Sequence, residues 1–161
     1  MSKKAVIITY GCQMNVNDSA KIKNVLVDMG YEMIDDIKEA DAVFINTCTV
    51  RDGAAQKVYG KLGELKHLKA KKSDMIVGVT GCLAQEEQEE VRKKVKFVDM
   101  VLGNQNIYKI PEYIEKILNK DLKNVVLVDN EDELPPRIDA QFDSSITACI
   151  SIMYGCNNFC T

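Results

Sequence analysis

The six cysteines of the 161-residue chain are the side chains best suited to chemistry. Three of them, Cys12, Cys48 and Cys82, follow the apolar runs of AVIITYGC, AVFINTC and MIVGVTGC. Two more, Cys156 and Cys160, form a C-x3-C pair in the tail YGCNNFCT. In a chain without a secretory signal, cysteines in such positions indicate metal binding or catalysis more than disulfides.

The first three cysteines are expected at the carboxyl ends of parallel strands. The common strand order 2-1-3-4-5 makes strands one, three and four neighbours, and ligands bind beyond the carboxyl ends of such strands. Because neighbouring strands lie about 4.8 Å apart, Cys12, Cys48 and Cys82 are expected to converge even without metal. Gly11 and Gly81 would let the backbone turn close to a bound group.

Three thiolates suit a four-iron cluster in which one iron stays open to an exogenous sulfur. Two other interpretations of the same cysteines stay open. They can be small buried apolar residues, or they can bind zinc together with a water molecule. For Cys156 and Cys160, the informative pattern would be C-x3-C-x2-C, whose third cysteine falls beyond Thr161. In that pattern the open iron chelates S-adenosylmethionine, and reduction releases a carbon radical.

The elements that position these cysteines are predicted to alternate between strand and helix. Strands are predicted at Ala5–Thr9, Tyr31–Ile34, Ala42–Asn46, Met75–Val79 and Val98–Leu102, with a sixth short one at Val125–Val128. Helices are predicted after a turn at Asn15–Ser19 and up to Gly30, from Asp52, at Gln85–Lys94 and from Pro111. We therefore expect an α/β fold with a doubly wound, mainly parallel five-stranded sheet flanked by helices.

Polar residues near the cysteines are expected to play two roles. Caps of the first helix are expected at Asn17, Asp18 and Ser19. Hydrogen bonds that tune a cysteine sulfur are expected from the residues that adjoin the cysteines, namely Asn15, Asn46 and Thr47.

Domain boundaries follow from a change in composition after the sixth predicted strand. The acidic stretch NEDELPPRIDAQFDSS has adjacent prolines and no periodicity, so residues 129–145 are predicted to be a linker. Residues 1–128 would form one domain, and residues 146–161 would begin another. The strand predicted at Ile146–Met153 lacks partners, so we expect the chain to be a fragment of a longer protein.

Charge and hydropathy exclude some classes of protein. No apolar run approaches the ~18 residues of a membrane helix, so we expect a cytoplasmic protein without a membrane partner. With 21 Lys and Arg against 24 Asp and Glu, the net charge of −3 shows no global nucleic-acid footprint. The lysines around His67 are interpreted as a solvated helix face; they are Lys57, Lys61, Lys66, Lys69, Lys71 and Lys72.

Four segments resemble, in order and spacing, the cysteine motifs of the radical S-adenosylmethionine methylthiotransferases. They are TYGCQMNVNDS, NTCTVRDGAAQKVYG, VTGCLAQ and IMYGCNNFCT. Gln13-Met14-Asn15 and Arg51 resemble the branch that acts on isopentenylated adenosine in tRNA. The branches acting on ribosomal protein and on threonylcarbamoyl adenosine typically have Pro-Lys-Asn and Lys-Val-Asn after their first cysteine. Cys149 matches no motif and is expected in a core.

The resemblance implies a role for each remaining cysteine. Cys12, Cys48 and Cys82 would hold an auxiliary 4Fe-4S cluster that carries the sulfur to be donated. Cys156 and Cys160 would be two of three ligands of a second, radical-generating 4Fe-4S cluster at the start of a truncated radical domain. No catalytic residue is assigned beyond these ligands.

The resemblance also implies the reaction and the partner. One S-adenosylmethionine would methylate the sulfur, and a second would generate the radical that abstracts hydrogen from C2 of adenine. The partner would be a tRNA anticodon stem-loop, and we expect a monomer. The sequence identifies neither the electron donor nor the sulfur source. Alternative functions are methylthiolation of another modified adenosine or a ribosomal protein, or a metal-binding or electron-transfer module without catalysis.

Overall fold

The computed structural model describes residues 2–48, 54–82, 84, 96–128, 136–138 and 140. Several features predicted from the sequence lie outside these residues. They are Asp52, the helix at 85–94, most of the linker, the strand at 146–153, Cys149, Cys156 and Cys160. The described residues thus belong mainly to the first predicted domain.

Six parallel strands form the centre of the fold. They are β1 (Lys4–Tyr10), β2 (Glu32–Met33), β3 (Ala42–Thr47), β4 (Ile76–Gly81), β5 (Met100–Leu102) and β6 (Val125–Leu127). Their order in the sheet is β2-β1-β3-β4-β5-β6. The order predicted for the first five strands is thus confirmed, and the α/β fold class with it. The sixth short strand predicted at Val125–Val128 is also found, as β6. It pairs in parallel with the outer edge of β5, with Val125 opposite Met100, so the sheet has six strands instead of the expected five.

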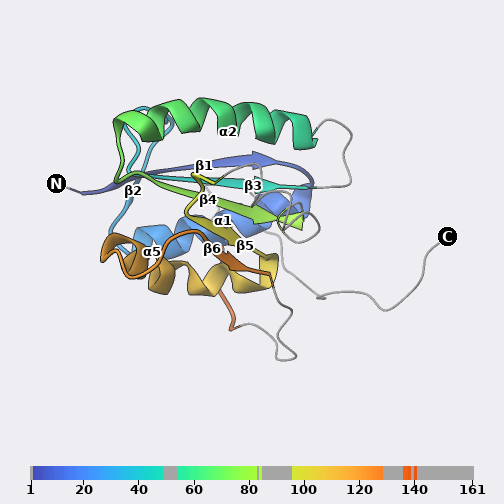
Figure 1. The fold of residues 1–161 in the computed structure, drawn as a ribbon. Helices are drawn as coiled ribbons and strands as arrows, with labels where there is room; N and C mark the ends of the chain where they lie inside the picture. The colour runs from blue at the N-terminus through green and yellow to red at the C-terminus, as the bar shows by residue number, and fades with distance from the viewer. Residues whose placement is uncertain are drawn as a thin grey trace.

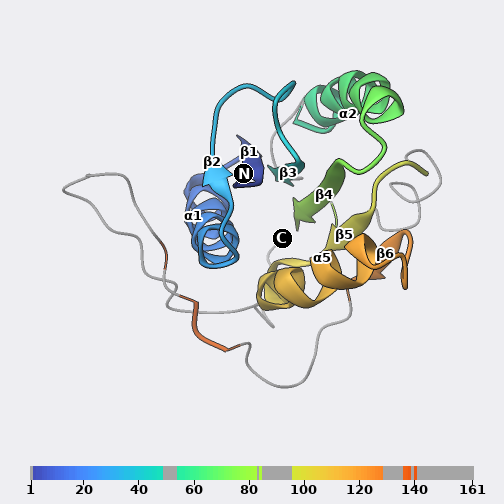
Figure 2. The ribbon, with the colours of Figure 1, turned by 90° about the vertical axis from the view of Figure 1, so that its left-hand side faces the viewer.

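Helices cover both faces of this sheet, as the view along the strands shows (Figure 1, Figure 2). The helices are α1 (Gln13–Asp28), α2 (Ala54–Lys71), the short 3₁₀ helix η1 (Asn104–Lys109) and α5 (Ile110–Leu118). Helix α2 lies on one face, and α1 and α5 lie on the other. None of the helices in the described part of the chain is long and apolar enough to cross a membrane.

The central strands are apolar because helices bury both of their faces. Every residue of β3 and β4 is buried, which is the pattern of a parallel sheet between two helical layers. Alternate side chains enter opposite cores. Val43 and Ile45 of β3 pack on the α2 side, whereas Phe44 packs with Ile22 and Leu26 of α1.

The first helix begins earlier than predicted and ends where predicted. Gly30 has a φ of +85°, and the backbone N–H of Tyr31 donates to the carbonyl of Leu26, so the helix stops there as expected. The predicted turn at 15–19 is wrong, because Cys12 is already the N-cap and α1 starts at Gln13. The residues expected as caps, Asn17, Asp18 and Ser19, lie inside the helix instead.

Candidate metal centre

The register of the sheet places the three cysteines at one edge. Tyr10 of β1 is aligned with Thr47 of β3, and Thr47 is aligned with Gly81 of β4. Cys12 lies two positions beyond this row, whereas Cys48 and Cys82 each lie one position beyond it. Because the three strands are neighbours, the cysteines emerge side by side at the carboxyl edge, as predicted from the strand order.

Cys12 joins the end of β1 to the start of α1. Its backbone is extended, with φ −95° and ψ −177°, and its N–H donates to Asn15 Oδ1 at 3.1 Å. A hydrogen bond from the backbone N–H of Asn15 to the sulfur is the largest influence on the thiol, and it lowers the pKa of Cys12. Burial opposes this shift, whereas hydrogen bonds from the Met14 N–H and the Cys48 thiol reinforce it. The helix start therefore favours the thiolate form.

Cys48 is the most enclosed of the three. Its side chain is only 2% exposed, and its backbone N–H continues the ladder by donating to the Tyr10 carbonyl at 3.0 Å. The Cys48 thiol is near enough to help lower the pKa of Cys12. The end of β3 and the loop after β1 thus bring these two thiols close together.

Cys82 is half-buried and has a different neighbour. The side-chain amide of Asn104 donates a long hydrogen bond to Cys82 Sγ, at 3.9 Å. Asn104 begins η1 directly after β5, the next strand along this edge. We did not predict a role for Asn104 from the sequence. The available signal was its place just after the strand predicted at Val98–Leu102. In the structure, Gly103 precedes Asn104 as the N-cap of η1.

Two buried asparagines, Asn15 and Asn46, support the loop that contains Cys12. Asn15 donates to Asn46 Oδ1 at 3.1 Å, and Asn46 donates to the Asn15 carbonyl at 2.8 Å and to Ser19 Oγ at 3.0 Å. Asn15 contacts the sulfur as expected, but as an acceptor, because the Cys12 thiol donates to Asn15 Oδ1 at 3.3 Å. Asn46 supports Asn15 instead of contacting a cysteine. Thr47, the third residue expected to bond sulfur, has a buried hydroxyl without any partner among the described residues.

Close backbone approach explains the glycines that precede two of the cysteines. Gly81 has a φ of +102°, and a Cβ there would lie 2.1 Å from the Thr47 carbonyl oxygen. A Cβ on Gly11 would lie 2.3 Å from Asn15 Oδ1 and 2.9 Å from Cys48 Cβ. Both positions therefore favour glycine, because protein atoms already fill the space that a Cβ would need.

The cysteines and the polar atoms around them suit a group that is bound by thiolates. Buried polar atoms without hydrogen-bond partners in the described part of the chain include Thr47 Oγ1, Thr80 Oγ1 and Asn104 Oδ1, all at or near this edge. Such atoms mark places where a bound group can supply contacts. The thiols do not yet form a ligand shell. Within the described residues, no set of three Cys, His, Asp or Glu side chains lies close enough to bind one metal ion.

Comparison with known families identifies the domain that carries this edge. A model described as uncharacterized protein family UPF0004 matches residues 4–103. The chain belongs to this family. The UPF0004 match extends from the start of β1 past the end of β5, so it includes Cys12, Cys48 and Cys82 together with the strands that present them.

This UPF0004 chain is also similar to curated proteins named tRNA-2-methylthio-N(6)-dimethylallyladenosine synthase. It is 63% identical over 159 residues to that of Fusobacterium nucleatum subsp. nucleatum, covering 99% of this chain and 36% of the relative. Identity is 44% over 155 residues with the Clostridioides difficile protein, at 95% and 32% coverage. With the Dictyoglomus thermophilum protein it is 42% over 163 residues, at 98% and 36% coverage. The chain thus spans about one third of these relatives, and the resemblance to methylthiotransferases is confirmed.

Proposed function

We propose that this UPF0004 domain holds a four-iron cluster on Cys12, Cys48 and Cys82 as part of a longer methylthiotransferase. The reaction would place a methylthio group on C2 of isopentenylated adenosine next to the tRNA anticodon. The names of the similar proteins support this substrate. Because the chain covers only about one third of those proteins, the activity is proposed for the longer protein.

One observation carries the proposal. Three cysteines emerge side by side from neighbouring strands, and the row of strand ends just before them is formed by Tyr10, Thr47 and Gly81, none of which is acidic or a histidine. When bound, a cluster with three thiolate ligands supplies an open iron at which an exogenous sulfur can be held for donation.

The chain's own residues would prepare the thiolates. Cys12 accepts hydrogen bonds from N–H groups at the start of α1, which favours its deprotonated form. Asn15 and Asn46 fix that helix start against β3. Asn104 would donate to the Cys82 thiolate, and binding would draw Cys82 toward the Cys12 and Cys48 pair. Outer hydrogen bonds of this kind orient ligands and tune a metal centre.

The remaining parts of the proposal concern the rest of the chain and its partners. Residues 1–128 would form the auxiliary-cluster domain, 129–145 the linker, and 146–161 the start of the radical domain. Cys156 and Cys160 would be two of three ligands of the second cluster, which binds S-adenosylmethionine. The partner would be the tRNA anticodon stem-loop, and the protein would act as a cytoplasmic monomer.

Anaerobic reconstitution with iron and sulfide tests the cluster assignment. The 161-residue chain should bind about four iron atoms stably, with visible absorption, because only one complete set of three ligands is present. Cys48→Ala should abolish this binding. Cys149→Ala is the matched control and should load normally, since that cysteine belongs to no motif. A colourless protein that binds only zinc, or normal iron loading by Cys48→Ala, would refute the proposal.

A further inference from the structure

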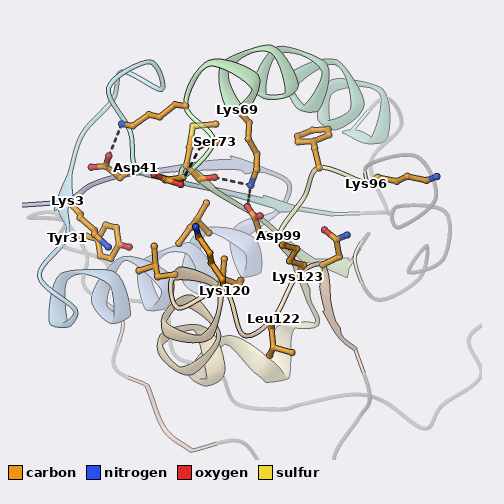
Figure 3. A pocket seen from close by; sticks show the side chains of 18 residues that line it. Lys3, Tyr31, Asp41, Lys69, Ser73, Lys96, Asp99, Lys120, Leu122 and Lys123 are labelled. Carbon is orange, nitrogen blue, oxygen red and sulfur yellow. Dashed lines mark hydrogen bonds and ion pairs between the residues drawn. The ribbon is translucent and has the colours of Figure 1, made fainter.

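A hollow lies at the opposite edge of the sheet from the cysteines. It has a volume of about 770 Å³ and lies where β1, β3, β4, β5 and β6 begin (Figure 3). Six lysines from segments far apart in sequence line it: Lys3, Lys69, Lys72, Lys96, Lys120 and Lys123. We call this hollow the basic pocket. The lining of this pocket therefore has an excess of positive charge, with six lysines against three aspartates, although the whole chain has a net charge of −3.

Two of the three aspartates that line the basic pocket are already neutralised. Asp41 pairs with Lys72 at 2.7 Å and also accepts the backbone N–H of Lys4 at 2.7 Å. Asp99 pairs with Lys69, which extends toward it from α2 in Figure 3. Asp41 and Asp99 thus hold the starts of their strands by ion pairs with Lys72 and Lys69.

Four lysines of the basic pocket remain without such a partner. No carboxylate in the described part of the chain forms an ion pair with Lys3, Lys96, Lys120 or Lys123. Asp74 is the third acidic residue of the lining, and it accepts a long hydrogen bond from its neighbour Ser73. Of these four lysines, Lys3 also acts through its charge on Asp41. Cations gathered from separate segments repel one another, and an anion would relieve this repulsion.

The loop between α5 and β6, which contributes Lys120 and Lys123 to the basic pocket, contains two residues other than glycine with a positive φ. Lys120 has a φ of +64°, in the left-handed region where a helix end normally uses glycine or asparagine. Glycine would adopt this φ with less strain than lysine does. What lysine adds at this position is therefore its charge. Asn124, with a φ of +55°, binds this loop to the segment that leads into β5. In the orientation that satisfies its amide, it donates to the carbonyls of Val98 (3.0 Å) and Lys96 (3.3 Å).

We propose that the basic pocket binds a phosphate group of an anionic ligand. Several ammonium groups on flexible stems suit a multiply charged phosphate as point charges. Half-exposed apolar side chains of Leu118 and Leu122 adjoin the lysines, so the pocket can also contact an uncharged part of the ligand. The phosphate can come from an RNA backbone or from a small phosphorylated molecule. This inference uses no residue of the cysteine edge and does not rest on the proposed function.

Two probes applied to the 161-residue chain distinguish these sources. One is a fluorescently labelled RNA stem-loop followed by anisotropy, and the other is inorganic phosphate followed by amide NMR shifts at constant ionic strength. Saturable binding of either probe, with shifts at Lys96, Lys120 and Lys123, is expected. Saturation by phosphate indicates a small-molecule source, whereas saturation by RNA alone indicates a backbone phosphate. Saturation by neither probe would overturn the proposal.

Charge-removing variants test whether the basic pocket is responsible. Lys120→Gly combined with Lys123→Gln should weaken binding at least about five-fold and, for RNA, reduce the salt dependence by roughly one ion per lysine. The glycine relieves the left-handed lysine, so the melting temperature should not fall because of it. Lys66→Gln is the control, an exposed lysine of α2 outside the pocket, and should change affinity less than two-fold. Equal losses in the two variants would overturn the proposal.

Discussion

Asn15 of α1 and Asn46 of β3 form a reciprocal, fully buried pair, in which each side-chain amide donates to the other residue at 3.1 and 2.8 Å. Asn15 also accepts the backbone N–H of Cys12. The pair therefore fixes the position of the Cys12 loop relative to the strand that carries Cys48.

Replacing Asn46 should destabilise the domain. Asn46→Leu keeps the branched shape of the side chain but leaves the Asn15 amide and carbonyl buried without these partners, which should cost about 1–3 kcal/mol of unfolding free energy. Urea denaturation measures this. Thr47→Val is the matched control in the same strand, because the Thr47 hydroxyl is already buried without a partner. It should leave stability unchanged or raise it, and a loss equal to that of Asn46→Leu would contradict this interpretation.

Gly81 should be equally intolerant of a side chain. Gly81→Ala would force a Cβ to 2.1 Å from the Thr47 carbonyl at a φ of +102°, so we expect a loss of at least about 1–3 kcal/mol. Thermal unfolding compares it with Gly63→Ala. Gly63 lies within α2 with open space around its Cα, and alanine there should stabilise the helix by roughly 0.5–1 kcal/mol. Similar effects at both positions would show that the close strand contact is absent.

Asp18 should make stability depend on pH in an unusual direction. Burial raises its pKa, and the charge and hydrogen bond of Lys21 only partly offset this. The folded state therefore holds the proton more tightly than the unfolded state. Its contribution to stability is greatest below the unfolded pKa of about 3.9 and declines as the pH rises through the folded pKa.

Asp18→Asn removes this titration and isolates its effect. The variant should therefore be more stable relative to the unmodified protein at pH 7 than at pH 3.5. Urea unfolding of both proteins at these two pH values measures the difference. A relative stability that is lower at pH 7 would mean that the Lys21 ion pair outweighs burial.

In a protein extended to the length of its relatives, the two clusters should be separable. Cys12→Ala should abolish methylthiolation of tRNA and leave reductive cleavage of S-adenosylmethionine largely intact, because the second cluster uses other cysteines. Cys156→Ala is the contrasting variant and should abolish both reactions. Product analysis by mass spectrometry measures each one. If folded Cys12→Ala lost both activities, the separate roles would be wrong.

The sequence predicted what depends on local pattern. Continuous apolar runs identified β3 and β4, and the common order of doubly wound strands placed the three cysteines at one edge. The start of α1 was mispredicted because cysteine is not a usual N-cap, and the Asn15 side chain that supports it acts only once the helix has formed. Helix caps were instead expected at the more typical residues that follow.

Features assembled from distant segments could not be predicted in this way. Asn104 reaches Cys82 only because β5 lies beside β4. The basic pocket combines lysines from several elements, and its charge is concealed in a composition with a net charge of −3. The lysines around His67 were interpreted as a solvated helix face, yet Lys69 and Lys72 of that group form ion pairs at the pocket.

Anomalous diffraction at the iron edge, from crystals of the anaerobically reconstituted chain, tests the central claim most directly. We expect one compact iron site at the carboxyl edge of β1, β3 and β4, bonded to the sulfurs of Cys12, Cys48 and Cys82. Asn104 should lie beside the Cys82 ligand, and one iron should lack a protein ligand. Iron bound anywhere else, or a cluster that omits one of these three cysteines, would contradict the account.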